Sequence, residues 1–390
     1  MIKQITFIIL VSVFGMSVSA EPSSKIPEKR DFILDKNVNP CDDFHDYVCS
    51  NVEKGFKLRD DRSSHTFAFD DSDERLLEKK KTFFKNIDKE KNLSSRSQQL
   101  KDYYKACMNK PEAIKEEKKL VAGLIKEVAA IKTIDDLIQL SRENMTNEKW
   151  AIAGYEIMPN IDDPKVYDMT FDISFMGLPE HSYYDNAELV KEYTQLMVEF
   201  LNTIYPKESI DDHAKRAQAI VDFEKKFIKF YPFPAEFRQR YTQPRKVSRE
   251  DFLKQSSVLK LDSFFEKNIP KGTLLRDFIP ESFDFVQKEV NAANLQILKD
   301  MYTYRSARDY MDDAYPALFK KRWDFRHKFL GGPITRSDRQ ERCTGGVMGA
   351  FSRELDIEML PRVFPDFPKD KMIEVAERIR ASILIGIEKK

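Results

Sequence analysis

Leu189-Val-Lys-Glu-Tyr-Thr-Gln-Leu-Met-Val-Glu-Phe-Leu-Asn-Thr-Ile204 decides the fold class of this 390-residue chain. The large apolar side chains recur every three or four residues, which is the spacing of one buried face of an α-helix. They are Leu189, Tyr193, Leu196, Met197, Phe200, Leu201 and Ile204. Pro206 follows and ends the predicted helix, because proline cannot continue the helical hydrogen bonding.

Other stretches repeat this helical period, so the sequence predicts a mainly α, multi-helix fold. They lie at 100–108, 217–231, 286–301, 347–359 and 372–387. The last stretch continues to within three residues of the end of the given sequence. A helix with so long an apolar face must bury it, so we expect 372–387 to pack on this chain or on another.

Residues 150–174 break the helical pattern. Trp150–Tyr155 and Val166–Ser174 are rich in β-favouring residues, and a spacer rich in Pro and Asp separates them. Two such runs around a turn-rich spacer predict a small β-hairpin.

The amino terminus has the pattern of a secretory signal peptide. Ile5 to Val18 is almost wholly apolar, and small residues precede a predicted cut after Ala20. We expect a signal peptide over 1–20, a linker over 21–38 and one domain over 39–390. The protein should then be secreted, with no membrane span after cleavage. An uncleaved signal anchor is the alternative, but it needs roughly 20 apolar residues.

Composition excludes two classes of function. The 65 basic and 65 acidic side chains give a formal net charge of zero, which offers no electrostatic footprint for nucleic acid. Only 12 glycines are present, which argues against a function based on glycine-rich phosphate loops.

If the protein is secreted, its cysteines can form disulfides and its sequons can carry glycans. Four cysteines, at 41, 49, 107 and 343, can pair in three ways, and composition does not choose among them. Asn92 and Asn144 each begin an Asn-x-Ser/Thr sequon and are predicted glycan acceptors on the surface.

Asn39-Pro-Cys-Asp-Asp-Phe-His-Asp-Tyr-Val-Cys49 resembles the signature that opens the ectodomain of the neprilysin and endothelin-converting-enzyme family of zinc endopeptidases. Further landmarks follow in family order at Leu100–Met108, Gly177–Tyr184, Phe223-Glu224 and Arg342-Cys343. The resemblance runs from about Asn39 to the carboxyl terminus. It implies the helical amino-terminal lobe of such a peptidase.

The residues that bind zinc in that family are not found in this sequence. A zincin presents two His at i and i+4 of one helix, in His-Glu-x-x-His, to a single Zn²⁺. Here the shortest His spacing is 20 residues, from His45 to His65. We therefore expect no catalytic residue, no metal ligand and no cofactor in this chain, although the full-length family uses zinc.

Three functions are compatible with this pattern. The favoured one is a non-catalytic lobe that binds peptides or proteins. The second is a truncated product of a gene for a zinc metalloendopeptidase. The third is a half-enzyme that docks on a separate chain carrying the zinc site. An isolated lobe of this kind should dimerise or be poorly soluble, because a face built for contact would be exposed.

The resemblance also implies roles for individual residues. Cys107 should pair with Cys343, whereas Cys41 and Cys49 resemble family cysteines whose partners lie in the other half. They should stay free or pair with another chain, a possible covalent partner. His65 aligns with an arginine that grips the substrate carboxylate, so it is a candidate substrate-facing residue. A mostly neutral imidazole cannot supply a bidentate fork.

Two acidic features have competing interpretations. Asp42, Asp43, His45 and Asp46 form a potential metal cluster, but acids at the start of a helix after Pro40 are the ordinary explanation. Glu224 interrupts an apolar helix face. We expect a buried ion pair with an arginine there rather than a catalytic acid.

Overall fold

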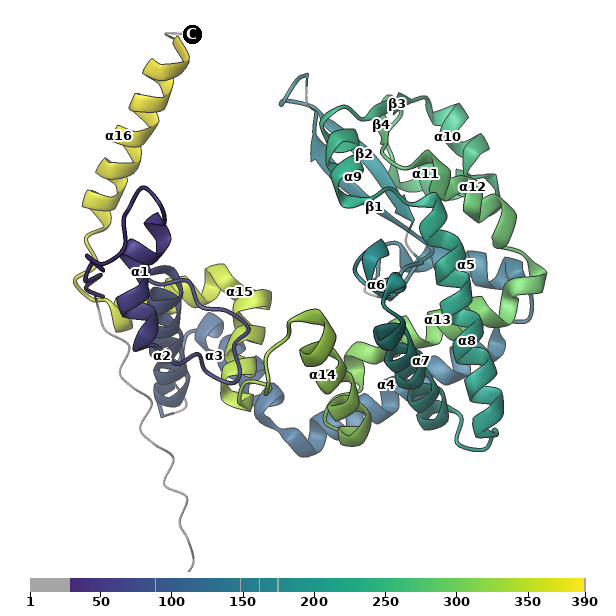
Figure 1. Ribbon diagram of the computed structural model, residues 1–390, viewed down its shortest axis with the longest axis horizontal. Coiled ribbons are helices and arrows are strands. Elements are labelled where there is room, and N and C mark those ends of the chain that lie inside the picture. The colour runs from purple at the N-terminus through teal and green to yellow at the C-terminus, as the bar shows by residue number, and fades with distance from the viewer. Residues whose placement is uncertain (1–28, 88, 148, 161, 174, 389–390) are drawn as a thin grey trace, which may run out of the picture.

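The computed structural model describes residues 29–87, 89–147, 149–160, 162–173 and 175–388. The predicted signal peptide lies outside these residues. The described chain is mainly helical and carries one four-stranded sheet, so the predicted fold class is confirmed (Figure 1). Among the described residues, no helix is both long enough and apolar enough to cross a membrane.

The helices and strands form two regions, each with its own hydrophobic core (Figure 1). The small subdomain contains α1 (Phe44–Lys54), α2 (Phe69–Ile87), α3 (Ser95–Met108), α15 (Arg339–Val363) and α16 (Lys369–Glu388). The large subdomain is inserted between α3 and α15. Its chain leaves the small subdomain after α3 and returns at α15, so the small subdomain is built from both ends of the domain.

The large subdomain is helical apart from its sheet. Its helices are α4 (Lys110–Ala130), α5 (Ile134–Asn144), α6 (His181–Asp185), α7 (Ala187–Ile204), α8 (Ile210–Phe227), α9 (Pro234–Thr242), α10 (Arg249–Gln255), α11 (Asp262–Asn268), α12 (Pro280–Glu289), α13 (Leu295–Ala307) and α14 (Pro316–Leu330). Short 3₁₀ helices are η1 (Ile228–Phe230), η2 (Ser257–Leu259), η3 (Ala292–Asn294) and η4 (Arg308–Tyr310).

Helix α7 carries the stretch that decides the fold class. The Asn186 side chain caps it by accepting from the Leu189 N–H at 3.0 Å. All seven apolar positions of the predicted face are buried in the main core. The helix ends at Ile204, ahead of Pro206. Helical period and proline therefore predicted both the buried face and the end of this element.

The predicted hairpin is confirmed as β1 (Ala153–Pro159) paired antiparallel with β2 (Tyr167–Ile173). The sheet is larger than predicted, with strand order β1-β2-β4-β3. β4 (Leu274–Asp277) pairs parallel with β2, and β3 (Arg245–Val247) pairs antiparallel with β4. The two added strands have three and four residues, too few for a period-two pattern to be recognised.

The small subdomain packs α2 and α3 against α15. Its core has seven buried apolar residues: Phe83, Phe84, Ile87, Leu100, Val347, Leu355 and Met359. The Phe84 and Tyr104 rings stack with centroids 4.4 Å apart. Helix α15 bends at Phe351, whose backbone is not helical. Gly345 to Gly349 lie within α15 and form no phosphate loop.

The local structure differs from the sequence pattern, or adds to it, at three places. The helical stripe over 286–301 is interrupted, because Val290 leaves helical geometry and the Asn291 side chain starts a new turn by accepting from the Ala293 N–H. Lys80 and Lys81 belong to the charge run at 78–81, a pattern typical of a solvated helix face, but they are only 6% and 7% exposed. Residues 29–38 belong to the predicted linker and contact α1, since the Asp35 N–H donates to the Tyr47 carbonyl at 2.8 Å.

The burial of Asn144 contradicts its prediction as a surface glycan acceptor. Asn92 is exposed, as a glycan acceptor must be, but Asn144 is buried at the end of α5. The Asn144 amide nitrogen donates to the Tyr302 hydroxyl at 3.1 Å and to the Trp150 carbonyl at 3.4 Å. A glycan on that nitrogen is incompatible with this packing. The sequon at Asn144 therefore does not mark a surface site.

Candidate functional site

A cavity of about 660 Å³ opens in the small subdomain. Its walls come from the loop at 62–65, from α2 and from the first turns of α15. Ser63, Ser64 and His65 line one side, and Arg342 and Met348 line the other. These segments are far apart in the sequence, so their side chains meet only in the fold. We take this cavity as the candidate ligand site.

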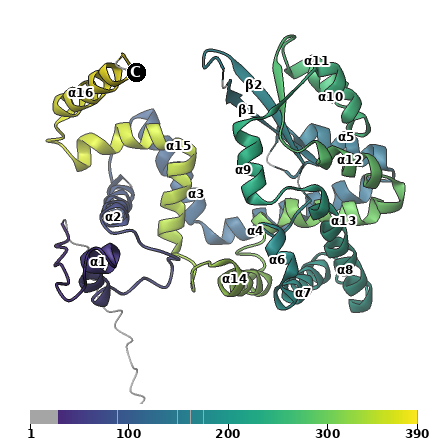
Figure 2. The same cartoon turned by 45° about the horizontal axis from the view of Figure 1, so that its top comes forward.

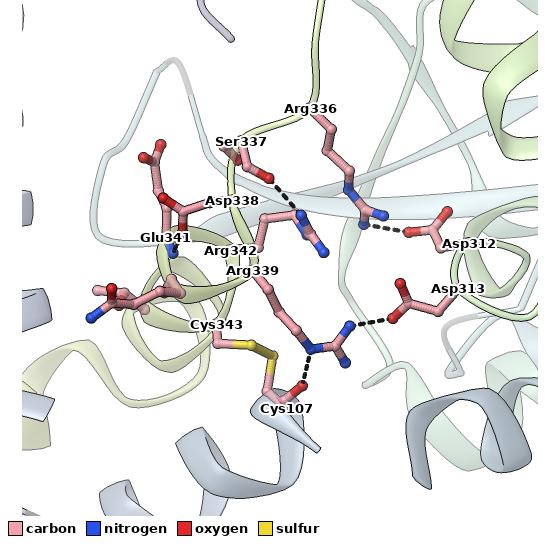
Figure 3. Close-up of a disulfide and its surroundings, with 12 residues drawn as sticks. Cys107, Asp312, Asp313, Arg336, Ser337, Asp338, Arg339, Glu341, Arg342 and Cys343 are labelled. Atoms are coloured by element: carbon pink, nitrogen blue, oxygen red, sulfur yellow. Dashed lines mark hydrogen bonds and ion pairs between the residues drawn. A yellow bond between two sulfur atoms is a disulfide. The ribbon is translucent and has the colours of Figure 1, made fainter. Parts of the chain in front are cut away.

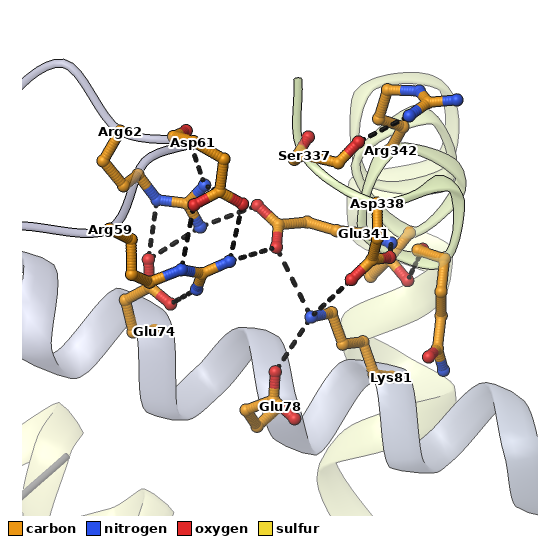
Figure 4. Close-up of polar contacts among 12 residues, drawn as sticks. Arg59, Asp61, Arg62, Glu74, Glu78, Lys81, Ser337, Asp338, Glu341 and Arg342 are labelled. Carbon is orange, nitrogen blue, oxygen red and sulfur yellow. Dashed lines mark hydrogen bonds and ion pairs between the residues drawn. The ribbon is translucent and has the colours of Figure 1, made fainter. Parts of the chain in front are cut away.

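An ionic network holds the walls of this cavity together (Figure 4). Glu341 of α15 accepts from Arg62 Nη2 at 2.6 Å, from Arg59 Nη2 at 3.2 Å and from Lys81 Nζ at 3.4 Å. Glu74 of α2 accepts from Arg62 Nε at 2.7 Å and also pairs with Arg59. Both carboxylates are therefore engaged in ion pairs. They serve to fix the loop against the two helices rather than to transfer protons.

The ion pairs of this network affect the pKa of Lys81. Burial alone would lower the pKa of Lys81, but its hydrogen bond to Glu78 and the negative charges of Glu78, Glu341 and Asp338 raise it. Lys81 therefore stays charged at neutral pH, and its ammonium group bridges α2 and α15 (Figure 4).

Two further cations line the cavity outside this network. Lys80 is buried, and its ammonium lies 3.5 Å from the Met348 sulfur. Arg342 Nη1 donates to the Ser337 carbonyl at 2.5 Å (Figure 4). Within the described part of the chain, neither cation has a carboxylate within ion-pair distance. An anionic group in the cavity would supply the charge that both lack.

Arg342 is half-buried among charges of both signs, from Arg336 and Arg339 and from Asp312 and Asp313. Burial, followed by the positive charge of Arg336, lowers its pKa, while Asp313 opposes the change. The guanidinium remains charged, since an arginine starts well above neutral pH. The cavity thus offers the cations Lys80 and Arg342, in a lining that also includes the carboxylates of Asp70, Asp73, Glu74 and Glu341.

His65 lies at the edge of this cavity, and its Nε2 is hydrogen-bonded to Asp71. His65 Nε2 is 3.1 Å from Asp71 Oδ1, and its side chain is only 8% exposed. Asp71 also accepts from Arg30 Nε at 2.5 Å and from Arg30 Nη2 at 2.7 Å. The hydrogen bond from Arg30 lowers the pKa of Asp71 to about 2. Contact between His65 and a substrate stays a prediction, and Arg342 is the cation better placed for a carboxylate.

Cys107 and Cys343 form a disulfide, the pairing that the family resemblance implies (Figure 3). Their Cα atoms are 5.6 Å apart, within the usual range for a bridge. Arg339 Nε donates to the Cys107 carbonyl at 2.9 Å, and Arg339 also pairs with Asp313. The bridge joins α3 to α15, where the chain leaves the small subdomain and returns to it.

Cys41 and Cys49 are both free. Cys49 lies on α1, whereas Cys41 precedes this helix, because α1 begins only at Phe44. Asp43 is its N-cap, and the Asp43 side chain accepts from the Asp46 N–H at 2.9 Å. The helix-start interpretation of this acidic stretch is therefore confirmed.

The described histidines do not assemble the zinc site of the family. Nε2 of His181 and of His213 meets the backbone carbonyls of Tyr231 and Tyr205, at 2.6 and 3.2 Å respectively. His327 Nδ1 lies 2.8 Å from the Gly332 carbonyl. Two imidazoles do not converge anywhere in the described chain. These residues therefore do not fit the catalytic zinc, and no hydrolytic step is derived through it.

Helix α1 holds a group of residues that sequence reasoning missed. Ligand atoms of His45, Cys49 and Glu53 lie within 4.8 Å of one another. The signal was present in the sequence, since the three residues recur every four positions and a helix places such positions on one face.

Glu224 is a structural residue, as predicted. It is 1% exposed and accepts from the Tyr184 hydroxyl at 2.8 Å and from the Tyr193 hydroxyl at 3.2 Å. Arg305 Nη2 lies 3.6 Å away and completes the buried ion pair. Burial raises the pKa of Glu224. A side chain at Gly177 would collide with this cluster, because its Cβ would lie 1.8 Å from Tyr193 Oη.

Solved structures with the same fold are zinc metalloproteases. Zinc metalloprotease Zmp1 of Mycobacterium tuberculosis, in complex with inhibitor, superposes with a TM-score of 0.71 at 17% identity, over 92% of this chain and 55% of that one. PepO from Lactobacillus rhamnosis HN001 gives 0.67 at 12% identity, over 90% and 56%. The fold is thus that of the helical lobe of a zinc metalloprotease, and the chain spans about half the length of these structures.

The family itself is shown by sequence. A model of the amino-terminal domain of peptidase family M13 matches residues 40–389. The chain therefore belongs to peptidase family M13, which confirms the resemblance to zinc endopeptidases noted in the sequence. No curated protein matches it significantly.

Proposed function

We propose that this chain is a secreted, peptide-binding lobe of a family M13 metallopeptidase, and that it does not hydrolyse peptides by itself. The observation that carries the proposal is the family match over 40–389 in a sequence that contains no His-Glu-x-x-His. Zinc and the water that it activates would have to come from residues other than these 390. The chain's own contribution is to bind and orient a peptide.

The cavity beside α15 supports a particular class of ligand. Lys80 and Arg342 line it without a carboxylate partner among the described residues, and Met348 offers apolar surface. A peptide that ends in a free carboxylate, or that carries an acidic side chain, supplies the missing charge. Arg342 is the residue best suited to hold it, because a guanidinium can bind a carboxylate through two parallel hydrogen bonds.

Hydrolysis is tested with the purified mature protein and a quenched fluorescent peptide. We expect no cleavage above background, with or without added Zn²⁺. Cleavage that a chelator abolishes, at a rate proportional to the protein concentration, would contradict the non-catalytic part of the proposal. A contaminating protease is recognised because it does not elute together with the protein on gel filtration.

Binding is tested by fluorescence anisotropy with one labelled peptide in two forms, with a free or an amidated carboxyl terminus. We expect the free acid to bind at least about 10-fold more tightly, since a charge-assisted bidentate contact contributes more than 1 kcal/mol. Arg342→Gln should remove this preference. Arg353→Gln, an exposed arginine on the same helix, should keep it. Equal binding of the two forms would contradict the assigned role of the cavity.

A second candidate function follows from α16. Its apolar residues are 44–65% exposed, from Val375 at the low end to Ile387 at the high end. This exposure favours the half-enzyme hypothesis, in which the lobe docks on a chain or segment that carries the zinc site. Adding the purified lobe to a separately made zinc-bearing half of a family M13 peptidase should then restore peptide cleavage. Ile379→Lys should prevent the restoration.

A further inference from the structure

The sheet of the large subdomain has one apolar face and one polar face, because side chains alternate between the faces along each strand. Tyr155 of β1 and Phe171 of β2 are cross-strand partners on the apolar face, where Phe171 belongs to the main core. Glu156 and Thr170 are partners on the polar face, which also carries Asp172, two residues after Thr170. β1 and β2 lie in the large subdomain, apart from the cavity beside α15 (Figures 1 and 2).

Two acids of the polar face are left without an opposite charge. The three basic residues of the four strands are each paired with a carboxylate. The pairs are Arg276–Asp168 at 2.5 Å, Lys246–Asp162 at 2.9 Å and Arg245–Asp277 at 2.5 Å. Glu156 and Asp172 have no basic side chain within ion-pair distance among the described residues. The polar face therefore carries two uncompensated negative charges.

Glu156 and Asp172 are close enough to repel each other. They are diagonal neighbours on adjacent antiparallel strands, and this relation places their Cβ atoms about 7–8 Å apart. Loss of part of its hydration, followed by the negative charge of Glu156, raises the pKa of Asp172. Both residues are nevertheless exposed, so a ligand can reach them from solvent. A cation held between them would remove the repulsion.

A buried hydroxyl on the same face lacks a hydrogen-bond partner. Thr170 is 4% exposed, and its Oγ1 has no partner among the described residues. Thr170 neighbours both acids, since it lies across the strand pair from Glu156 and two residues before Asp172. A buried polar atom without a partner costs free energy comparable to a lost hydrogen bond. A donor group of a ligand at this point would supply the missing bond.

There is room for a ligand beside Asp172. Its cross-strand partner is Gly154, and a Cβ added there would meet no atom within 4 Å. Tyr231 borders the same face, because it packs against the cluster that contains Met158, a polar-face residue of β1. Burial, followed by the charge of Asp172, raises the pKa of Tyr231 to about 12. The aromatic ring adds a surface that attracts cations.

We propose that Glu156, Thr170 and Asp172 form a subsite for a primary ammonium group of a peptide, either its amino terminus or a lysine side chain. A primary ammonium has three N–H donors, and the site offers three acceptor groups, two carboxylates and a hydroxyl. Ca²⁺ would need roughly six to eight oxygen ligands, more than these side chains provide. The subsite rests on the proposed peptide-binding function and adds a contact of opposite charge in the other subdomain.

The experiment measures binding by fluorescence anisotropy with two pairs of peptides, all amidated at the carboxyl terminus and labelled through a side chain. The first pair contains no lysine and differs only in acetylation of the amino terminus. The second pair is acetylated at the amino terminus and differs only in acetylation of one lysine. We expect the free amine to bind at least about 10-fold more tightly in one pair, which identifies the source of the ammonium group.

Variants of the polar face test whether this preference arises there. Asp172→Asn and Glu156→Gln should each remove most of it, whereas Asp284→Asn, at an exposed acid of α12, should keep it. Gly154→Lys should also abolish the preference, because its own ammonium competes for the two carboxylates. Gly154→Ala is the matched control, since an added Cβ meets no atom within 4 Å. Unchanged circular dichroism checks that each variant is folded.

Either of two results would overturn this proposal alone. One is equal binding within both pairs of peptides. The other is a preference for the free amine that survives in Asp172→Asn and in Gly154→Lys. The preference for a free carboxylate, tested through Arg342, is measured with different peptides and can hold when this subsite fails. If no peptide of any form binds, the peptide-binding function and the subsite are both wrong.

Discussion

The two subdomains are stabilised by different means. The large subdomain has an extensive apolar core in which aromatic rings pack at steep angles to one another. Phe285 contacts Phe175, Phe223 and Phe227 at centroid distances of 5.1–5.6 Å. The small subdomain has only seven residues in its buried core. It adds the disulfide, and the ion pairs of Glu74, Glu341 and Lys81 (Figures 3 and 4).

This difference explains where the candidate site lies. A region held by ion pairs and a covalent bridge can keep charged side chains near its surface and still have a defined shape. A region held by apolar packing excludes such groups, and the large core admits Glu224 only with hydrogen bonds from two tyrosines and an ion pair with Arg305. The cavity with Lys80 and Arg342 is therefore in the less apolar subdomain.

Breaking the disulfide should have the largest effect on this contrast. In the loop-entropy model, a bridge between residues 236 positions apart contributes about 5 kcal/mol. The Cys107→Ser, Cys343→Ser protein should lose the small subdomain and keep the large one. Thermal unfolding should change from one transition to two, and limited proteolysis should cut α2 and α15 while sparing 110–330.

The matched control for this experiment is Cys41→Ser, which removes a free, exposed thiol. It should leave the thermal transition where it is. If loss of the bridge instead lowers the stability of both subdomains together, in one cooperative transition, the division into two separately stabilised regions is wrong.

Truncating a ring of the large core should have the next largest effect. Phe285 is fully buried, and Phe285→Ala removes a side chain whose neighbours cannot all close the gap. We expect the free energy of unfolding to fall by about 3–5 kcal/mol, measured by denaturant titration. Phe69→Ala is the control, because Phe69 is 77% exposed and its truncation should cost no more than about 0.5 kcal/mol.

A smaller, pH-dependent effect should come from Asp71 in the small subdomain. Arg30 holds the pKa of Asp71 at about 2, below its value of about 3.9 in an unfolded chain. Because the folded pKa is the lower one, the stabilisation is fully present above about pH 5 and is lost as the pH falls toward 2. The shift corresponds to about 2.6 kcal/mol.

Asp71→Asn should remove this contribution at neutral pH and flatten the dependence of unfolding on pH between 5 and 2. Asp73→Asn is the control. Asp73 is exposed and lies two residues after Asp71 on α2, so this variant should keep the wild-type pH profile. A wild-type protein whose unfolding midpoint is unchanged between pH 5 and 2 would show that the Arg30–Asp71 pair does not stabilise the fold.

Local patterns in the sequence predicted the elements that depend on neighbours in the chain. The α7 stripe and the hairpin follow from the alternation of apolar and polar residues. Glu224 was predicted correctly because an acid on an apolar face must find a partner. The order of landmarks in the sequence predicted the family.

Features made by distant residues could not be predicted in this way. The Arg59–Glu341 contact spans 282 residues, and no local period encodes it. Lys81 appeared to belong to a solvated charge run because its partner Glu341 lies on another helix. Asn144 looked like a glycan site because a sequon carries no information on burial. The cavity was missed for the same reason, since its walls come from both ends of the domain.

Substitutions on the exposed face of α16 should have the smallest effect on stability, but a clear effect on self-association. Ile379 and Ile383 are each 56% exposed, so replacing both by Lys removes no buried contact and should change the free energy of unfolding by less than about 0.5 kcal/mol. We expect the wild-type lobe to pair with a second copy through this face, since its apolar stripe is uncovered within the described chain. In sedimentation the double variant should be a monomer, whereas Ala381→Lys, on the opposite face of the helix, should still associate. A monodisperse wild-type monomer would mean that the exposed face of α16 does not drive self-association, and the contrast between the two subdomains would then rest on the disulfide and the ion pairs alone.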